Sequence, residues 1–289
     1  MDNRTGKRMA VKRMRCQSSE QLRRAQKEIE THRELSSHPY ILPLLDWGTK
    51  RIPAGHIVDM LFPLCKKSLR QEIDDRVLEH RSSPWTKDEL VKLFRGVCHG
   101  LKAMHDHSPS WAHRDLKPDN ILLDHAGRPM IMDFGSVEVA DVKVTSRSQA
   151  LLVQETAAEH CTMPYRAPEL FDVPSDVTLN ARADIWSLGC VLFAMMYGYS
   201  PFECEFHGKK VVVVECTHLR VIGRLPEPPE ELKRYPAFLE ALTIAMLRKE
   251  YKHRPNVDRV LRELDTPDTP DTEPGSQRSI QNFAQFPPV

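Results

Sequence analysis

The chain has 289 residues, of which 40 % are hydrophobic and 28 % charged, an ordinary composition for a globular protein. Its net charge of +1 gives no overall field that attracts nucleic acid or an anionic membrane, so neither is predicted as a partner. The 7 cysteines are scattered without a C-x-x-C pair, which argues against a disulfide framework and favours a reduced, cytoplasmic compartment.

Two further patterns limit the class of protein. The longest apolar run, residues 185–196, is too short to span a bilayer and predicts a buried core helix, so no transmembrane segment is expected. The closest histidines, His105 and His107, are interpreted as polar surface at a helix end rather than as a metal site.

The first part of the chain predicts a small sheet with one helix. Residues 1–15 indicate a turn at Thr5-Gly6 followed by a strand. A helix is expected from Ser18, which fits a capping box with Gln21. Residues 38–47 predict a breaker and then an apolar strand, and residues 56–64 predict another strand. One face of the helix carries Leu22, Ala25, Ile29 and His32.

The remainder is mainly helical in pattern. Residues 68–80 predict one helix, and Thr86 with Glu89 forms a capping box for a longer one. Residues 121–124 and 129–133 indicate a short hairpin, and helices resume near Asp184. The Pro/Thr/Asp-rich residues 265–289 lack the apolar content to fold alone and are predicted to be disordered.

The motif with the clearest chemistry is "HRDLKPDN", residues 113–120, followed by "DFG", residues 133–135. Phosphoryl transfer needs a carboxylate to orient the attacking hydroxyl, a lysine to neutralise the moving phosphoryl group, and oxygen ligands for Mg²⁺. Asp115, Lys117, Asn120 and Asp133 supply these groups, and the two motifs together are highly specific.

These motifs resemble the eukaryotic protein kinase catalytic domain, from about Thr5 to Leu264. The resemblance implies an α+β, two-lobe fold, with ATP and Mg²⁺ as cofactors and a protein Ser/Thr hydroxyl as acceptor. The implied organisation is a truncated, β-rich N-lobe with hinge in residues 1–65, a helical C-lobe in residues 66–264, and the tail in residues 265–289.

The same resemblance places the other site residues. Lys12 in "MAVK" is expected to contact the α- and β-phosphates, with Asp115 and Lys117 as its catalytic partners and Asn120 and Asp133 as Mg²⁺ ligands. Asp184 is expected to brace the catalytic loop, and Glu169 to form a structural pair with Arg254. The residues expected around the adenine are Ala10, Phe62, Pro63, Leu64, Cys65 and Leu122.

Three glutamates, Glu28, Glu30 and Glu34, compete as the partner of Lys12. On a helical wheel the apolar face centres near Ala25, and Glu28 lies about 60° from that centre, while the other two point nearly opposite. Glu28 is therefore selected, with a solvated surface charge as the alternative interpretation.

Hydroxyl specificity is indicated by Lys117 and Thr162, a combination typical of Ser/Thr kinases. Residues 147–171 and 184–198 narrow the resemblance to the Numb-associated kinase group, in particular to its myristoylated and palmitoylated, Golgi-localised Ser/Thr branch. Members of this group carry a helix within the activation segment. Residues 147–160 contain no breaker and predict such a helix, with an extended loop as the alternative.

The sequence departs from the family pattern near its start, because no G-x-G-x-x-G precedes Lys12. A truncated relative of an active Ser/Thr kinase is the favoured interpretation, and a kinase-fold scaffold without activity is the alternative. A small-molecule kinase fits less well, because "YRAPE" and Arg254 are typical of kinases with protein substrates. Membrane association is expected only if a lipidated N-terminus is missing from this chain.

The activation segment also contains candidate sites for regulation by phosphate. Arg114, before the catalytic Asp115, is of the type that binds a phosphate on the activation segment. A helix already formed in that segment lessens the need for such a switch. The candidate acceptors are Thr145, Ser146, Ser148 and Thr156.

Overall fold

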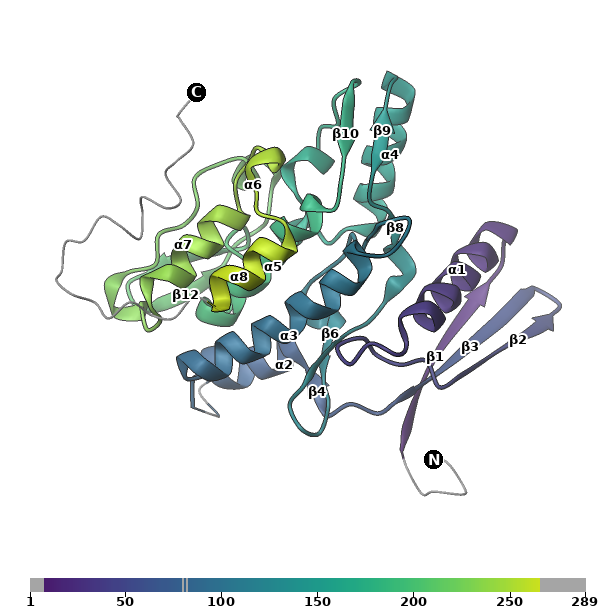
Figure 1. Cartoon of the computed structure of the whole chain (residues 1–289), viewed down its shortest axis with the longest axis horizontal. Helices are drawn as coiled ribbons and strands as arrows, with labels where there is room; N and C mark the ends of the chain where they lie inside the picture. Colours follow the sequence, from purple (N-terminus) through teal and green to yellow (C-terminus); the bar gives the residue numbers. More distant parts are fainter. Residues whose placement is uncertain (1–7, 80, 82, 266–289) are drawn as a thin grey trace.

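The computed structural model describes residues 8–79, 81 and 83–265. Figure 1 shows a small lobe of sheet and one helix beside a larger, mainly helical lobe. The predicted α+β class is confirmed. The elements of the small lobe are β1 (Met9–Cys16), α1 (Ser19–Leu35), β2 (Asp46–Ile52) and β3 (Gly55–Pro63).

The small lobe is an antiparallel sheet of order β1-β3-β2 with α1 packed on one face. Alternate residues of β3, namely Val58, Met60 and Phe62, are buried, as expected when one face of a sheet meets a helix. All of β2 except Ile52 is exposed. The core of this lobe is therefore one-sided and small.

Helix α1 begins with the cap that the sequence predicts. Ser18 Oγ accepts the N–H of Gln21 at 3.1 Å, while the Gln21 side chain accepts from Gln17 rather than from Ser18. The inward face includes Ala25, Ile29 and two polar residues, Glu28 and His32.

The apolar strand expected in residues 38–47 does not form, so that prediction is wrong. Ile41 and Leu42 are buried, but they meet Ile131 of the larger lobe through one parallel bridge. Pro39 and Pro43 flank this stretch and lack the N–H that a ladder needs, which explains why only an isolated bridge remains.

The larger lobe holds the remaining helices and several short hairpins. The predicted hairpin of residues 121–133 is confirmed as the antiparallel pair β6 and β7, to which β4 adds a third strand. The elements are β4 (Lys67–Ser68), α2 (Leu69–Ile73), α3 (Lys87–His105), β5 (Trp111–Ala112), β6 (Ile121–Leu123), β7 (Pro129–Ile131), β8 (Glu138–Val139), β9 (Val142–Val144), α4 (Arg147–His160), β10 (Val177–Leu179), α5 (Arg182–Tyr197), β11 (Cys204–His207), β12 (Lys210–Val213), α6 (His218–Val221), α7 (Ala237–Met246) and α8 (Val257–Asp265).

Helix α5 forms the centre of the larger lobe. Residues 183–197 are all buried, which confirms the core helix predicted from the apolar run. It contacts α3 and α7, and α8 also packs against α3. Figure 1 shows these helices together in the larger lobe. The predicted capping box of α3 is present, because Thr86 Oγ1 accepts from Glu89 N and Glu89 Oε2 accepts from Thr86 N.

The helix predicted for residues 68–80 is only partly correct. After α2 the chain widens into a π-helical turn, Asp74–Leu78, in which Glu79 N donates to Asp74 O at 2.8 Å. In this arrangement both Glu72 and Asp75 reach the ammonium of Lys67. The hydrophobic pattern does not distinguish such a turn from an α-helix.

Both ends of the chain carry predictions that fall outside the described residues, namely the turn at Thr5-Gly6 and the tail beyond residue 265. Asp265 itself, assigned to the tail from sequence, is the last residue of α8 and contacts Arg95 at 2.9 Å. Within the described residues, none of the helices combines the length and the hydropathy that crossing a bilayer requires.

Candidate active site

The backbone of the catalytic loop, residues 113–120, is fixed by Asp184 at the start of α5. Its carboxylate accepts the N–H of His113 at 2.8 Å and that of Arg114 at 2.9 Å. His105 Nε2 lies 2.9 Å from the same carboxylate. Burial raises the pKa of Asp184, but the hydrogen bond and charge of His105, together with the charges of Arg114 and His113, lower it below its ordinary value. The loop therefore rests on a buried carboxylate that stays ionised.

This network corrects the interpretation of His105 as polar surface. Its side chain is only 9 % exposed and pairs with Asp184. The reason is that the last turn of α3 ends beside the first turn of α5, where a hydrogen-bonding group is needed. His107 instead stacks on Trp111, with ring centroids 3.6 Å apart, and contacts Glu34.

Asp115 lies at the centre of a set of short contacts. Its Oδ1 accepts the N–H of Thr162 at 2.8 Å, and its Oδ2 lies 3.0 Å from both Asn120 Nδ2 and Lys117 Nζ. Lys117 Nζ also donates to Thr162 Oγ1 at 2.6 Å. The segment before Tyr165 and the catalytic loop are thus joined through three side chains, and Asp115 is only 9 % exposed.

A second group of charges joins the two lobes. Lys12 Nζ from β1 contacts Glu28 Oε1 of α1 at 2.6 Å and Asp133 Oδ1 at 2.7 Å. The contact from α1 thus comes from the glutamate that the helical wheel selects, while Glu30 and Glu34 are exposed.

The electrostatics of this group follow from its burial. Burial lowers the pKa of Lys12, but the charges of Glu28 and Asp133 outweigh it and raise the pKa above its ordinary value. Burial raises the pKa of Glu28, with Lys12 opposing the shift. Burial raises the pKa of Asp133, but contacts led by that with Lys12 lower it below its ordinary value. Asp133 also has a positive φ of 66°, a strained conformation of the kind found at functional sites.

The residues expected around the adenine lie where the small lobe meets the larger one. Ala10 and Phe62 are opposite each other on β1 and β3, and Pro63 ends β3. Cys65 and Leu122 pack against the core of the small lobe, although Leu122 belongs to β6 of the larger lobe. Leu64 is 41 % exposed. The sequence separates these residues widely, and the fold brings them to one boundary.

The chemistry of Asn120 and Asp133 fits a magnesium ion. Asn120 Nδ2 donates to the Asp115 carbonyl at 2.8 Å and to the Asp115 carboxylate. The side-chain oxygen of Asn120 is therefore left as a metal ligand. The lowered pKa of Asp133 keeps its carboxylate ionised. Mg²⁺ at phosphoryl-transfer sites takes one or two protein oxygen ligands together with substrate phosphates, so this pair is sufficient.

The helix predicted for residues 147–160 is confirmed as α4, capped by Ser146 Oγ, which accepts from Gln149 N at 3.3 Å. Its buried residues are Ala150 and Ala157, whereas Leu151 and Leu152 are 40 % and 64 % exposed. Small residues face the domain, so α4 joins the core of the larger lobe through Ala150 and Ala157.

The four candidate phosphate acceptors lie in two places. Ser146 caps α4, with Thr145 and Ser148 in the same turn. Thr156 lies farther along α4 and lines, together with Arg114, a mainly apolar cavity of about 270 Å³ between α4 and the strands β8 and β9. Arg114 Nη2 donates to Ala140 O at 3.3 Å.

The pair expected between Glu169 and Arg254 is a buried, bidentate contact. Both guanidinium nitrogens lie 2.7 Å from the two carboxylate oxygens, and Arg254 is 1 % exposed. The guanidinium also lies over the ring of Trp186, 4.9 Å from its centroid. This pair holds the end of the activation segment on the larger lobe.

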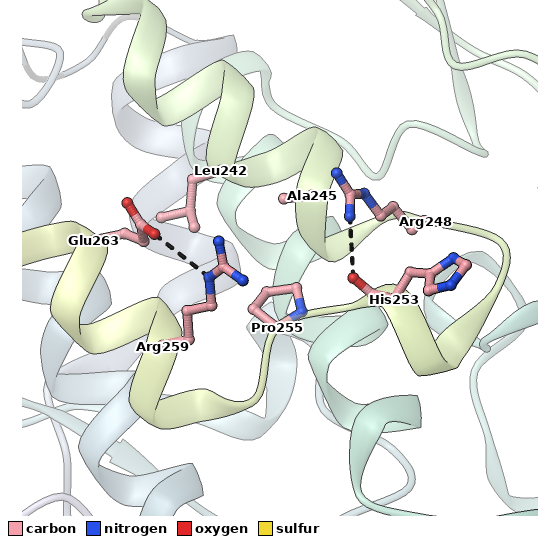
Figure 2. A pocket seen from close by; sticks show the side chains of 7 residues that line it. All are labelled: Leu242, Ala245, Arg248, His253, Pro255, Arg259 and Glu263. Carbon is pink, nitrogen blue, oxygen red and sulfur yellow. Dashed lines mark hydrogen bonds and ion pairs between the residues drawn. The ribbon is translucent and has the colours of Figure 1, made fainter. Parts of the chain in front are cut away.

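A separate hollow lies near the end of α7 (Figure 2). Its volume is about 10 Å³, the space of a single water. Arg259 Nε lies 3.5 Å from Glu263 Oε1, and Arg248 Nη1 donates to His253 O at 3.3 Å. The first contact lies within α8 and the second within the segment between α7 and α8, and neither Asp115 nor Lys12 lines this hollow.

Comparison with known proteins places this geometry in a family. The protein kinase domain family matches residues 1–264. Serine/threonine-protein kinase 16 of Mus musculus is 39 % identical over 258 residues, covering 89 % of this chain and 80 % of the relative; the Rattus norvegicus protein is 38 % identical with the same coverage. Serine/threonine-protein kinase ppk13 of Schizosaccharomyces pombe is 29 % identical over 290 residues, covering 89 % and 82 %.

Proposed function

The chain belongs to the protein kinase family, and we propose that it transfers the γ-phosphoryl group of ATP to serine and threonine hydroxyls of proteins. The named relatives are serine/threonine kinases, and use of ATP with a divalent metal is general in the family. The observation that carries the proposal is Asp115, held at hydrogen-bonding distance from both Lys117 and Thr162.

On the acceptor side, Asp115 orients the substrate hydroxyl and receives its proton as the oxygen attacks phosphorus. Lys117 lies beside it and stabilises the charge on the group in transfer. Thr162 holds Asp115 through its N–H and Lys117 through its hydroxyl, so the three groups keep one geometry. Such fixed positioning supplies most of the rate enhancement in phosphoryl transfer.

On the donor side, Lys12, held by Glu28, binds the α- and β-phosphates. Asn120 and Asp133 would hold Mg²⁺, which when bound would neutralise charge on the phosphates. The adenine binds at the boundary between the lobes, where backbone groups of residues 63–65 are available to it. Its apolar surroundings are Ala10, Phe62, Leu64, Cys65 and Leu122.

The test is Mg²⁺-dependent transfer of labelled phosphate from ATP to casein by the full chain. We expect Asp115→Asn to lower kcat about a thousandfold or more, because a positioned proton acceptor contributes about 10²–10⁴-fold. Asp176→Asn, an exposed carboxylate, serves as the matched control and should retain the wild-type rate. A wild-type protein without transfer contradicts the proposed function, and an active Asp115→Asn variant contradicts the role of Asp115.

The comparisons do not support the alternative of an inactive scaffold, because the three relatives all carry the name of a kinase. Golgi association through a lipidated N-terminus remains a prediction from the resemblance. Protein phosphorylation in the presence of vesicles, compared with free solution, would measure whether this chain acts at membranes.

A further inference from the structure

Two helices that are distant in sequence, α1 and α4, meet through a charged contact. Arg24 of α1 donates to Nε2 of His160, the last residue of α4, and lies 3.5 Å from Glu159 Oε1. Within α1, the same guanidinium contacts Glu20 at 2.7 Å. A single arginine thus joins the helix that carries Glu28 to the C-terminal end of the activation-segment helix (Figure 1).

A second contact supports the same junction. Lys27 Nζ of α1 lies 2.8 Å from Glu138 Oε2, in the strand that follows the Asp133-Phe134-Gly135 motif. Ser136 Oγ, between that motif and β8, donates to the carbonyl of His160 at 3.2 Å. The first residues after Asp133 therefore contact both helices.

The α4 side of the junction is fixed to the larger lobe. Arg166 Nη2 donates to Cys161 O at 2.8 Å and to Ala158 O at 3.2 Å, which holds the last turn of α4. The apolar cavity of about 270 Å³ between α4, β8 and β9 is lined by His160 and Cys161 as well as by earlier residues of α4. The hydrogen bonds of Arg166 therefore hold the end of α4 that α1 meets.

The junction lies next to the residues that bind phosphate in the proposed function. Arg24 and Glu28 are four residues apart on α1, and both line a cavity of about 380 Å³ that also contains Lys12, Asp133 and His160. The Glu28 carboxylate is only 3 % exposed, and burying it without the ion pair to Lys12 would destabilise the fold. A contact one turn away that holds α1 in place therefore helps to keep that pair closed.

We propose that Arg24 is a positioning residue, which through His160 and Glu159 keeps α1 oriented so that Glu28 holds Lys12, without a phosphate on the activation segment. This inference rests on the proposed function, because it assigns Arg24 an effect on the Lys12 that binds the nucleotide. In this protein the end of α4 supplies the attachment for α1 that a phosphorylated residue would otherwise supply.

The exposure of these side chains separates this role from a general effect on stability. Arg24 is 41 % exposed and Glu159 is 64 % exposed, and such pairs contribute little to the free energy of unfolding. We therefore expect Arg24→Glu to lower kcat/KM for ATP about tenfold, a typical coupling between two sites, with the urea midpoint unchanged. Arg23→Glu, an exposed change of the same charge one residue earlier, is the matched control and should match the wild type.

A charge swap tests the contact itself. His160→Arg alone places two guanidinium groups together and should also lower kcat/KM. The double variant, Arg24→Glu with His160→Arg, restores an ion pair and should recover most of the wild-type value. Hydrogen exchange in residues 19–35 without nucleotide should rise in each single variant and fall again in the double variant.

The outcomes distinguish the inference from the proposed function. An inactive wild type contradicts the proposed function, while the hydrogen-exchange pattern still tests the junction. An active wild type with an equally active Arg24→Glu variant overturns the inference, and so does a double variant without recovery. A fall in the urea midpoint of Arg24→Glu that accounts for the lost activity also overturns it. Phosphatase treatment of the wild type should leave activity unchanged, and its loss would overturn the phosphate-free mechanism.

Discussion

The two groups of charges in the candidate site are held in different ways. In the larger lobe, Asp184 and the Glu169–Arg254 pair are almost fully buried, with Asp184 and Arg254 side chains 1 % and 0 % exposed. At the lobe boundary, the side chains of Lys12 and Asp133 are 31 % and 39 % exposed. The acceptor side is thus part of a rigid core, whereas the donor side depends on ion pairs near solvent.

The cores explain this difference. The small lobe buries a few apolar residues on one face of its sheet, while the larger lobe has a continuous core around α3 and α5. Regions with few buried apolar contacts open with a low free energy, and moving elements are drawn from them. We infer that the larger lobe sets the geometry for the hydroxyl, and that the position of α1 decides whether Lys12 is in place.

The largest expected effect tests the rigid side. Arg254→Met removes a guanidinium that contacts both oxygens of Glu169 and the carbonyls of Arg248, Lys249 and Arg182. Because a buried carboxylate and several acceptors lose their partner, we expect the free energy of unfolding to fall by about 3–5 kcal/mol. Urea unfolding followed by tryptophan fluorescence measures it, since Trp186 lies against this guanidinium.

The matched control for this variant belongs to the small lobe. Arg13 makes a bidentate contact with Asp59 at 2.7 and 2.8 Å, but its side chain is 61 % exposed. Arg13→Met should therefore hardly change the midpoint. Equal effects of the two variants would contradict the contrast between a rigid and a weakly held region.

Much of this arrangement could be predicted from the sequence, because it depends on patterns among neighbouring residues. The cap of α1, the capping box of α3, the buried run of α5 and the helix of residues 147–160 are set by neighbouring residues. The position of Glu28 beside the apolar face of α1 could also be predicted, because a helix face is defined within a few turns. For the site, the spacing of "HRDLKPDN" and "DFG" was sufficient to name its charged residues.

What the sequence did not predict depends on contacts between distant segments. Arg24 resembles any solvated helix charge, and only the fold brings His160 to it. The local pattern predicts His105 as polar surface, but the fold places Asp184 of α5 beside it. Ile41 and Leu42 carry a strand-like pattern, but their partner is Ile131 in the other lobe. In each case the tertiary partner overrides the local pattern.

A smaller effect is expected on the donor side. Glu28→Gln removes the carboxylate that positions Lys12 and should lower kcat/KM for ATP about 10- to 100-fold, because small misplacements of a positioning group have effects of that size. Glu30→Gln, an exposed change on the same helix, should leave it unaffected. Steady-state kinetics with varied ATP measures both. A loss in Glu30→Gln with none in Glu28→Gln would contradict the assignment of the inward glutamate.

The smallest effect concerns the boundary between the two lobes. His32 of α1 packs against Phe62 of the small lobe and Phe134 of the larger one, and burial lowers its pKa to about 4. The folded protein therefore keeps His32 neutral, while the unfolded chain takes up a proton below about pH 6.5. The contribution of neutral His32 to the free energy of unfolding is therefore complete above that pH. It falls by about 1 kcal/mol between pH 6.5 and 5.5.

His32→Gln keeps a donor for Leu42 O and should flatten the pH profile of urea midpoints by this amount. The exposed His125→Gln should leave the profile unchanged. Parallel profiles for His32→Gln and the wild type would mean that the folded protein also accommodates protonated His32. Water would then reach the boundary between the two lobes more freely than the packing indicates.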